Sequence, residues 1–359
     1  MIPPIEIAPV APADEEALAD FLATFPGLEC RLEFWLSRFR LWWQGNPACA
    51  GSPAGWILRR DGAIQGFLGN LPSLFQLGGG PKTVYSITSW MVLPECREQS
   101  LSLLMEHMKA ADQTLLFDTT PTAVVATILE SLGFRPLPWA GDRESFIVVD
   151  CKRVLAAAAP GLLRGVGLPA LAAAGLAPLQ TLRLRPLHAS GLLPAVKSSD
   201  VGEEFDELWD RTRGLYANTN VRTAQAVRWY GLGDGEIEKE LFICRQEGRL
   251  CGYMILKSRT RHGLKTLDCV DFWEDPSAAG VLESLLATVW NTAQDRRLDL
   301  LTFPHFTTRF GERLGRAGLF EHASGRRALF FGTPELLASI TSENSYFVGL
   351  QGDYGTAAS

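Results

Sequence analysis

The sequence predicts a mixed α/β fold, in which helices pack on mixed β-sheets, built from two copies of one domain. The main observation is an internal repeat. The segment 57–67 resembles the segment 243–253, and its glycines, Gly62 and Gly66, recur in the second segment 186 residues later. A repeat of such long period indicates a duplicated structural unit. The length of 359 residues also suits two domains of about 150–180 residues each. Both halves have the same predicted order of helices and strands, which favours a mixed sheet in each.

The elements of the first half follow from the spacing of apolar residues and from turn residues. Apolar residues at steps of three and four predict helices, and runs rich in β-branched residues predict strands. Asp61-Gly62 between two apolar runs is typical of a short hairpin turn. In chain order we predict helices at 13–25 and 33–43, a hairpin at 55–71, a strand at 83–93, a helix at 101–110, a strand at 114–117, a helix at 123–132 and a closing strand at 145–149.

The second half repeats this order. We expect domain boundaries that give a first domain at 1–150, an interdomain strap at 151–200 and a second domain at 201–359. The predicted elements of the second half are a helix at 203–216, a hairpin at 240–257, a strand at 265–272, a helix at 279–294, a strand at 298–303, a helix at 308–317 and a last strand at 328–332.

The segment between the halves has an unusual composition. Residues 151–199 include six basic residues and no acidic one, and 166–182 is apolar apart from Gln180 and Thr181. Prolines interrupt the segment, so it cannot form a straight membrane-spanning helix. Our first interpretation is a strap of short helices packed on the two domains. The alternative is an interfacial element that contacts anionic lipid or a membrane-bound partner.

Composition and charge exclude several classes of protein. The net charge of −6 and the pI near 5.5 argue against binding to nucleic acid, which usually needs a basic face. The seven cysteines lack Cys-x-x-Cys spacing, so we expect reduced thiols and no metal site. The N-terminus has neither a basic nor an apolar region of the signal-peptide type. We therefore expect a cytoplasmic protein, with a peripheral place at the inner membrane as the alternative.

The most specific local signal follows the strand that ends at Leu93. Backbone N–H groups at the start of a helix, with the helix dipole behind them, can bind a pyrophosphate. The segment 94–104 resembles motif A of the GNAT superfamily of acyl-CoA-dependent N-acyltransferases, in which a strand leads into Arg/Gln-x-x-Gly-x-Gly/Ala; here serines replace the usual glycines. The resemblance implies that acetyl-CoA or another acyl-CoA binds at Met91, Val92, Arg97, Glu98, Gln99, Ser100, Leu101 and Ser102.

Further segments carry the same resemblance. A strand that ends in the segment 118–121 precedes a helix that closes with Gly133-Phe134, and the hairpin at 57–67 matches the early hairpin of the family. The pattern covers about 30–150, and a weaker version covers 203–332, where no arginine corresponds to Arg97. The chain thus resembles two tandem GNAT-like domains of the type associated with bacterial exopolysaccharide gene clusters. The resemblance implies a small amine as acceptor, such as an amino sugar or an amino acid, and no metal.

The chemistry of such a transfer calls for a carboxylate, because the attacking amine must lose a proton. Asp268 and Asp271 lie on the strand of the second half, three residues apart, so we expect them on opposite faces of its sheet. Asp118 follows a strand of the first half and is either a catalytic carboxylate or a cap of the next turn. His305 at a strand end is a further candidate base. The segment 346–354, with its tyrosines, could close over a site.

Three functions remain open at this point. The first is an acyl-CoA-dependent N-acyltransferase. The second is a catalytically inactive scaffold in a polysaccharide-synthesis assembly. It is favoured by the serines in the predicted phosphate-binding segment 91–102, called the cradle below, and by the lack of an obvious base. The third is an acyltransferase that takes its acyl group from an acidic carrier protein, which would contact the basic side chains Arg153, Arg164, Arg183 and Arg185.

Overall fold

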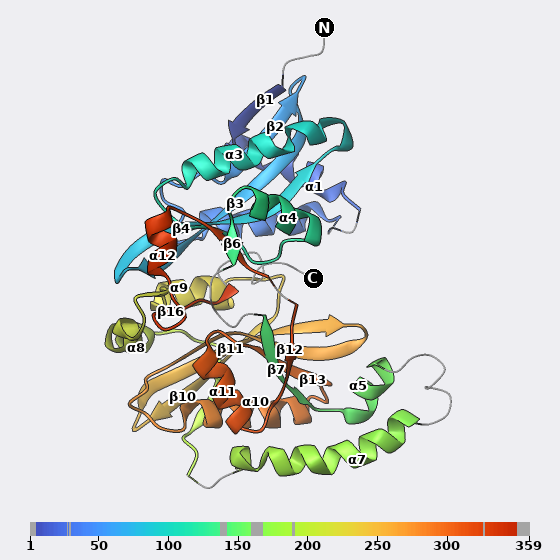
Figure 1. The fold of residues 1–359 in the computed structure, drawn as a ribbon, viewed down its shortest axis with the longest axis vertical. Coiled ribbons are helices and arrows are strands. Elements are labelled where there is room, and N and C mark those ends of the chain that lie inside the picture. Colours follow the sequence, from blue (N-terminus) through green and yellow to red (C-terminus); the bar gives the residue numbers. More distant parts are fainter. Residues whose placement is uncertain are drawn as a thin grey trace.

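The computed structural model describes residues 5–26, 28, 30–136, 142–158, 168–188, 191–325 and 327–349. Two mixed β-sheets with their helices lie one above the other along the long axis of the molecule (Figure 1). The strand order of the first sheet is β1-β2-β3-β4-β5-β15-β6, with β9 and β16 beside β3. That of the second sheet is β14-β7-β13-β12-β11-β10-β8. The predicted mixed α/β class is confirmed.

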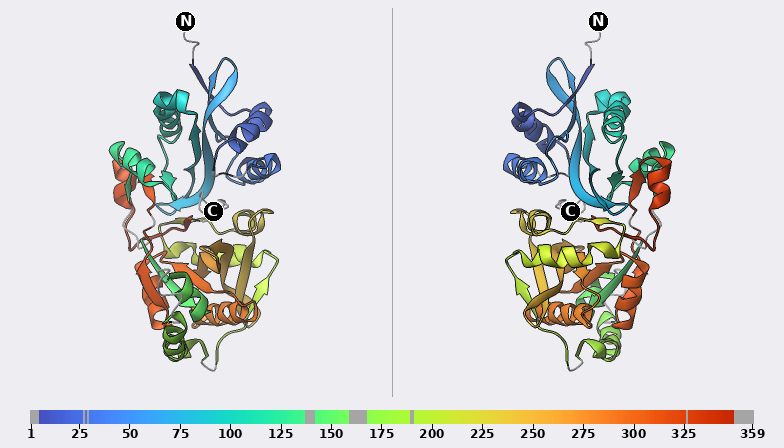
Figure 2. Two further views of the ribbon diagram at one scale, coloured as in Figure 1. Left: turned by 90° about the vertical axis from the view of Figure 1, so that its right-hand side faces the viewer. Right: turned by 90° about the vertical axis from the view of Figure 1, so that its left-hand side faces the viewer.

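The first sheet is covered on both faces by helices. Helices α1 and α2 pack on one face, and α3 and α4 lie on the other (Figure 2). Its elements are β1 (Ile5–Pro9), α1 (Glu15–Ala23), α2 (Leu32–Phe39), β2 (Gly55–Arg60), β3 (Ala63–Leu77), β4 (Gly80–Val92), α3 (Ser100–Ala110), β5 (Leu116–Asp118), α4 (Ala123–Ser131) and β6 (Arg135–Pro136).

The second sheet and the connections around it use the rest of the described chain. Its strands are β7 (Arg143–Val148), β8 (Ala195–Ser198), β10 (Lys239–Gln246), β11 (Arg249–Arg261), β12 (Leu264–Glu274), β13 (Leu300–Pro304) and β14 (Phe320–Ala323). The other elements are α5 (Cys151–Ala158), α7 (Leu168–Arg183), α8 (Glu204–Thr212), β9 (Asn218–Asn220), α9 (Ala224–Val227), α10 (Val281–Asp295), α11 (Thr308–Arg316), β15 (Leu329–Phe331), α12 (Pro334–Ser339) and β16 (Ser345–Tyr346).

The repeat seen in the sequence is visible in the backbone of the two hairpins. Asp61 and Gly62 have φ values of 53° and 78°, and Glu247 and Gly248 have 53° and 81°. Two successive residues with positive φ form the tight turn whose twist suits an antiparallel hairpin. The glycines at these positions therefore serve the same local geometry in both halves.

The last strand of each half lies in the sheet of the other half. β7 pairs with β13 and β14 of the second sheet, and β15 pairs with β5 and β6 of the first. The prediction that 145–149 closes the first sheet, and 328–332 the second, is therefore wrong. The apolar pattern identified both strands but carries no information about which sheet edge each one joins. Neither sheet is formed from one continuous part of the chain.

The two halves also share a hydrophobic core. One cluster of buried side chains runs from Phe39 and Trp43 in the first half to Trp229 and Leu241 in the second. The indole N–H of Trp229 donates to the backbone oxygen of Leu41 at 2.8 Å. Burial of this apolar surface opposes separation of the halves.

The interdomain segment is helical where the structure describes it. The amide of Gln180 on α7 hydrogen-bonds to the backbone of Val148 in β7. Arg183 donates to the backbone oxygens of Gly318 and Leu319. The end of α7 is thus fastened to the second sheet. Among the described residues no helix is both long and apolar enough to cross a membrane.

Candidate functional site

In both halves the two central parallel strands separate at their carboxyl ends. β4 pairs with β5 only at Tyr85 and Ser86, and β12 pairs with β13 only from Thr266 to Asp268. A β-bulge interrupts the pairing of each longer strand with its antiparallel neighbour, close to the point of separation. Bulges bend a strand and increase its twist. The separation exposes backbone groups between the strands, at the edge of the sheet where α/β proteins commonly bind ligands.

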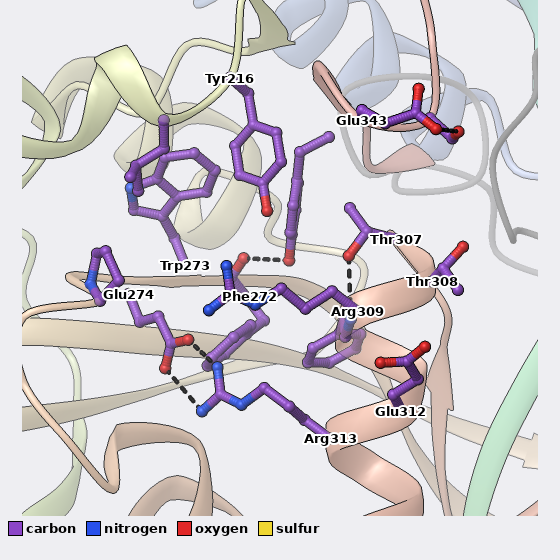
Figure 3. Close-up of a pocket in the computed structure, with 15 residues that line it drawn as sticks. Tyr216, Phe272, Trp273, Glu274, Thr307, Thr308, Arg309, Glu312, Arg313 and Glu343 are labelled. Atoms are coloured by element: carbon purple, nitrogen blue, oxygen red, sulfur yellow. Dashed lines mark hydrogen bonds and ion pairs between the residues drawn. The ribbon is translucent and has the colours of Figure 1, made fainter.

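A cavity of about 530 Å³ lies at this edge in the second half (Figure 3). Part of its wall is the end of β12 and the first turns of α11. The opposite part is the segment 342–346, which pairs through β9 with β3 of the first sheet. The cavity therefore lies at the junction of the two sheets. Its lining residues are Leu215, Tyr216, Phe272, Trp273, Glu274, Pro276, Thr307, Thr308, Arg309, Phe310, Glu312, Arg313, Ser342, Glu343 and Tyr346.

Aromatic side chains line the cavity and pack against one another. The ring of Tyr346 packs against those of Trp273 and Tyr216, with 5.3 Å between centroids in both cases. Phe272 stacks on Phe310 of α11 at 5.1 Å. The hydroxyl of Tyr346 donates to the backbone oxygen of Phe272 at 2.7 Å and so joins β16 to β12. This packing gives the cavity a rigid wall, because each ring is held by at least one other.

Glu274 and Arg313 form an ion pair at the base of the cavity. The guanidinium of Arg313 contacts both carboxylate oxygens of Glu274, with 3.2 Å between Nη2 and Oε2. A second carboxylate, that of Glu283, lies 3.7 Å from Arg313. Burial raises the pKa of Glu274 above its ordinary value, although Arg313 opposes the shift. Glu274 is thus a carboxylate at the cavity with an increased affinity for a proton.

Arg309 differs from Arg313 in having no ion pair with any other residue that the structure describes. Its side chain extends from α11 across the cavity, below Tyr216 and Trp273 and above Glu274 and Arg313 in the view of Figure 3, with Glu312 and Glu343 on the right. Burial raises the pKa of the Tyr216 hydroxyl, and the positive charge of Arg309 opposes that shift. The charge of Arg309 also opposes the rise in the pKa of Glu274, but no carboxylate of the described residues lies within ion-pair distance of it.

Asp271, predicted as a catalytic carboxylate, lies in the core behind the cavity wall. Its oxygens accept hydrogen bonds from Arg222 at 3.2 and 3.3 Å, and from the hydroxyls of Tyr230 and Tyr253, each at 2.9 Å. Both side chains of the ion pair are fully buried. The Arg222 guanidinium lies over the ring of Trp273, 4.1 Å from its centroid. In this structure Asp271 therefore anchors the aromatic wall.

Asp268 is buried near Asp271, and the two lie on the same face of the sheet. Asp268 pairs with Lys257 and Asp271 with Ile255, because the bulge inserts one extra residue into β12 between the two aspartates. Lys257 and Ile255 are two residues apart on β11, so they and their partners lie on one face. The expectation of opposite faces is therefore wrong: it assumed a regular strand, and a bulge changes the alternation. The carboxylate of Asp268 accepts hydrogen bonds from Thr302 at 2.8 Å and from Arg259 at 3.2 Å.

Asp118 and His305, the remaining predicted catalytic groups, have structural partners. Asp118 accepts a hydrogen bond from the backbone N–H of Thr120 at 2.9 Å. It thus caps the turn after β5, which was the second of the two roles considered for it. The imidazole of His305 is 2.8 Å from the hydroxyl of Ser145 on the exchanged strand β7, and burial lowers its pKa. Gly311 leaves room for this ring, because a Cβ there would lie 2.3 Å from Nδ1. Neither side chain lines the cavity.

The predicted cofactor residues lie at the corresponding edge of the first half. Met91 and Val92 end β4, a 3₁₀ helix spans Pro94–Gln99, and α3 begins at Ser100. Arg97, Glu98 and Ser102 are exposed, Gln99 and Ser100 are half-buried, and Leu101 is 46% exposed. No side chain caps the first amide groups of α3. The predicted cradle is therefore open to solvent, and its role stays a prediction.

The first-half cradle and the cavity lie far apart along β4. Gln76 pairs with both Pro81 of β4 and Thr219 of β9, so the start of β4 faces the junction with the second half. Val92 is eleven residues further along, about 36 Å at about 3.3 Å per residue. A ligand at the cradle and a ligand in the cavity would therefore occupy separate sites.

Several residues of the cavity were not among the predicted site residues. Arg309 and Arg313 are one helical turn apart on α11, which could have identified a charged helix face. Glu274 lies two residues before Pro276, at the end of a predicted strand. Tyr216 carried no local signal, since only the fold brings it to β12. Tyr346 belongs to the segment predicted to close over a site, and it does line the cavity; 350–354 lie outside the described residues.

Comparisons with known proteins identify the fold. No family model matches the chain, and no curated protein matches it significantly. A GCN5-related N-acetyltransferase from Anabaena variabilis superposes with a TM-score of 0.60 at 13% identity, over 91% of this chain and 72% of that one. A probable N-acyltransferase of unknown function from Enterococcus faecalis gives 0.57 at 12%, over 91% and 72%. Saccharomyces cerevisiae N-myristoyltransferase with bound myristoyl-CoA gives 0.55 at 12%, over 91% and 78%. The chain has the fold of the GCN5-related N-acetyltransferases, as the resemblance of its motifs predicted.

Proposed function

We propose that the protein is an acyl-CoA-dependent N-acyltransferase that transfers an acyl group, acetyl in the simplest case, to the amine of a small molecule. The observation that carries the proposal is the cavity where β12 and β13 separate, in a fold found in such enzymes. Volumes of about 300–1,000 Å³ are typical of ligand pockets. The cavity combines apolar surface with a few charged groups, as a site that orients a small substrate requires.

The reaction assigns a role to two of the lining residues. The amine nitrogen attacks the thioester carbonyl; the C–N bond forms, the C–S bond breaks, and the amine proton leaves. Glu274 accepts that proton, directly or through water, since burial makes its carboxylate a stronger base. The Tyr216 hydroxyl donates a proton to the departing thiolate. Backbone N–H groups of the separated strand can stabilise the negative charge on the carbonyl oxygen.

Substitution of Glu274 tests the assignment of the base. We expect Glu274→Gln to lower kcat for acetyl transfer by about 10²–10⁴-fold, the usual contribution of a general base. In the unmodified protein kcat/KM should rise with pH through the pKa of this carboxylate. Because that pKa is raised, the rise should lie at higher pH than for an ordinary glutamate, and it should vanish in the variant. A variant with full activity and an unchanged pH profile would exclude Glu274 as the base.

In this proposal acetyl-CoA binds at the cavity of the second half. The alternative donor site is the cradle of the first half, residues 91–102. Thr308→Trp places a bulky ring at the exposed start of α11, on the cavity wall, whereas Arg97→Glu reverses a charge in the cradle. By calorimetry, Thr308→Trp should weaken acetyl-CoA binding at least about tenfold, about 1.4 kcal/mol, and more than Arg97→Glu does. Ser342→Trp blocks the cavity from the opposite wall and gives a second test if Thr308→Trp does not fold. A larger loss of acetyl-CoA binding in Arg97→Glu than in Thr308→Trp would place the donor site in the first half.

The other two functions make different predictions. If neither acetyl-CoA nor free CoA binds, the enzyme proposal fails and a scaffold in a polysaccharide-synthesis assembly becomes the better account. A carrier-protein donor is less well supported, because two of the basic side chains assigned to it have partners within the chain. Arg153 lies 3.1 Å from Asp299, and Arg183 binds backbone oxygens and lies over Phe320. Arg164 lies outside the described residues.

A further inference from the structure

The charges of the cavity are arranged unevenly. Arg313 is neutralised by Glu274 and Glu283, whereas Arg309 has no carboxylate within ion-pair distance among the described residues. The Arg309 side chain is exposed at the cavity, so an anionic ligand can reach its guanidinium. Its planar donors match the geometry of a carboxylate. Arg309 is therefore positioned to bind an anionic group of a ligand.

The remaining walls match the other parts of such a ligand. Tyr216 and Trp273 line the cavity on the side of Arg309 away from Glu312 and Glu343 (Figure 3). The half-buried ring of Tyr216 is accessible to a ligand, whereas Trp273 lies behind it and is 2% exposed. Both acidic side chains are exposed at the rim. A ligand with an apolar or aromatic body, a carboxylate and an amine would find a complementary group for each. A neutral amino sugar has no anionic group for Arg309.

We infer that the acceptor is an amine that also carries a carboxylate, namely an amino acid with an aromatic or large apolar side chain, and that Arg309 binds this carboxylate. The inference rests on the proposed function, since it names the acceptor of that reaction. Glu312 and Glu343 attract the ammonium form of the amine to the cavity. The ammonium loses one proton to solvent and becomes the neutral nucleophile, and Glu274 accepts the second proton as the C–N bond forms. Tyr216 contacts the side chain of the acceptor.

The test compares amines that differ only in the carboxylate. Transfer from acetyl-CoA is measured with phenylalanine and phenethylamine, with tyrosine and tyramine, and with glucosamine. We expect kcat/KM for each amino acid to exceed that of its decarboxylated partner by about 10- to 100-fold, the range for a charged hydrogen-bonded pair. Arg309→Gln should remove this preference, because KM should rise far more for the amino acid than for phenethylamine.

Two further variants separate recognition from a general structural effect. Arg309→Lys keeps the charge and should restore part of the preference. Arg316→Gln, on the same helix but outside the cavity, removes an exposed arginine and should leave the preference intact. If phenethylamine or glucosamine is as good an acceptor as phenylalanine, or if Arg309→Gln keeps the preference, the inference is wrong while the proposed function stands.

Direct binding decides the case in which no transfer occurs. Calorimetry of phenylalanine and phenethylamine with the intact protein, in the presence and absence of CoA, measures the carboxylate preference without turnover. Binding of phenylalanine that is at least about tenfold tighter and is lost in Arg309→Gln would support the assignment of Arg309 even if acyl transfer fails. Equal binding of the two amines, or no binding of either, would overturn it.

Discussion

The carboxyl ends of the paired parallel strands in the two halves have the same backbone plan but different side chains. Pro94 and Pro276 follow β4 and β12 at corresponding positions, and each strand has a bulge before it. Two residues before these prolines, the first half has Val92 and the second has Glu274. The following backbone differs too, with a 3₁₀ helix after Pro94 and a turn that ends at Gly280 with φ 79° after Pro276. One end carries a charged cavity and the other an open helix start. A duplicated fold therefore does not imply two equivalent sites, because function depends on the side chains placed on it.

The polar cores behind these strand ends differ as well. In the second half, Asp271 binds Arg222 and two tyrosines in a fully buried network. The corresponding residue of the first half is Ser89, which has a positive φ of 49° at the bulge. The first half instead buries His107 against Asn70, at 3.1 Å. The second half thus supports its strand end with charge and the first with a neutral hydrogen bond.

The largest expected effect comes from breaking the exchange of β7 and β15. A fragment of residues 1–150 lacks β15, so β5 and β6 lose their common partner and the core shared with the second half is exposed. We expect this fragment to show no cooperative unfolding transition by circular dichroism. Co-expression with residues 151–359 should restore it. A fragment as stable as the intact chain would mean that the halves are independent.

Loss of the buried carboxylate is the next largest effect. Asp271→Ala leaves Arg222 buried without its partner, which costs about 3–5 kcal/mol. The matched change in the first half, Ser89→Ala, removes no charge and should cost less than about 1 kcal/mol. Urea unfolding of both variants measures the difference. Similar losses at the two positions would show that the charged network does not distinguish the halves.

The smallest expected effect is a loss of stability in acid that arises in the first half. Burial lowers the pKa of His107 from 6.5 to about 3. Below pH 6.5 the unfolded chain binds a proton that the folded chain does not, so stability present above that pH is lost as the pH falls toward 3. The loss between pH 6.5 and 5.5 should be about 1 kcal/mol. His107→Gln should remove this part of the pH dependence in urea unfolding. If the slope is unchanged, His107 is not the group responsible.

The sequence was informative about local structure and less so about the site. Periodicity and turn residues located β4, α3 and the Asp61-Gly62 turn, because these depend on neighbours in the chain. The strand exchange, the bulge at Asp271 and the meeting of Tyr216 with β12 depend on contacts between distant segments, which one sequence does not reveal. Motif A pointed to the first half because an arginine after a strand can be recognised in a sequence, whereas a cavity forms only on folding.

A structure with bound CoA and an amine would test the location of the active site most directly. We expect ligand density in the cavity of the second half, beside Tyr216, Glu274 and Arg309. Density beside residues 92–104 of the first half, with the cavity empty, would contradict it.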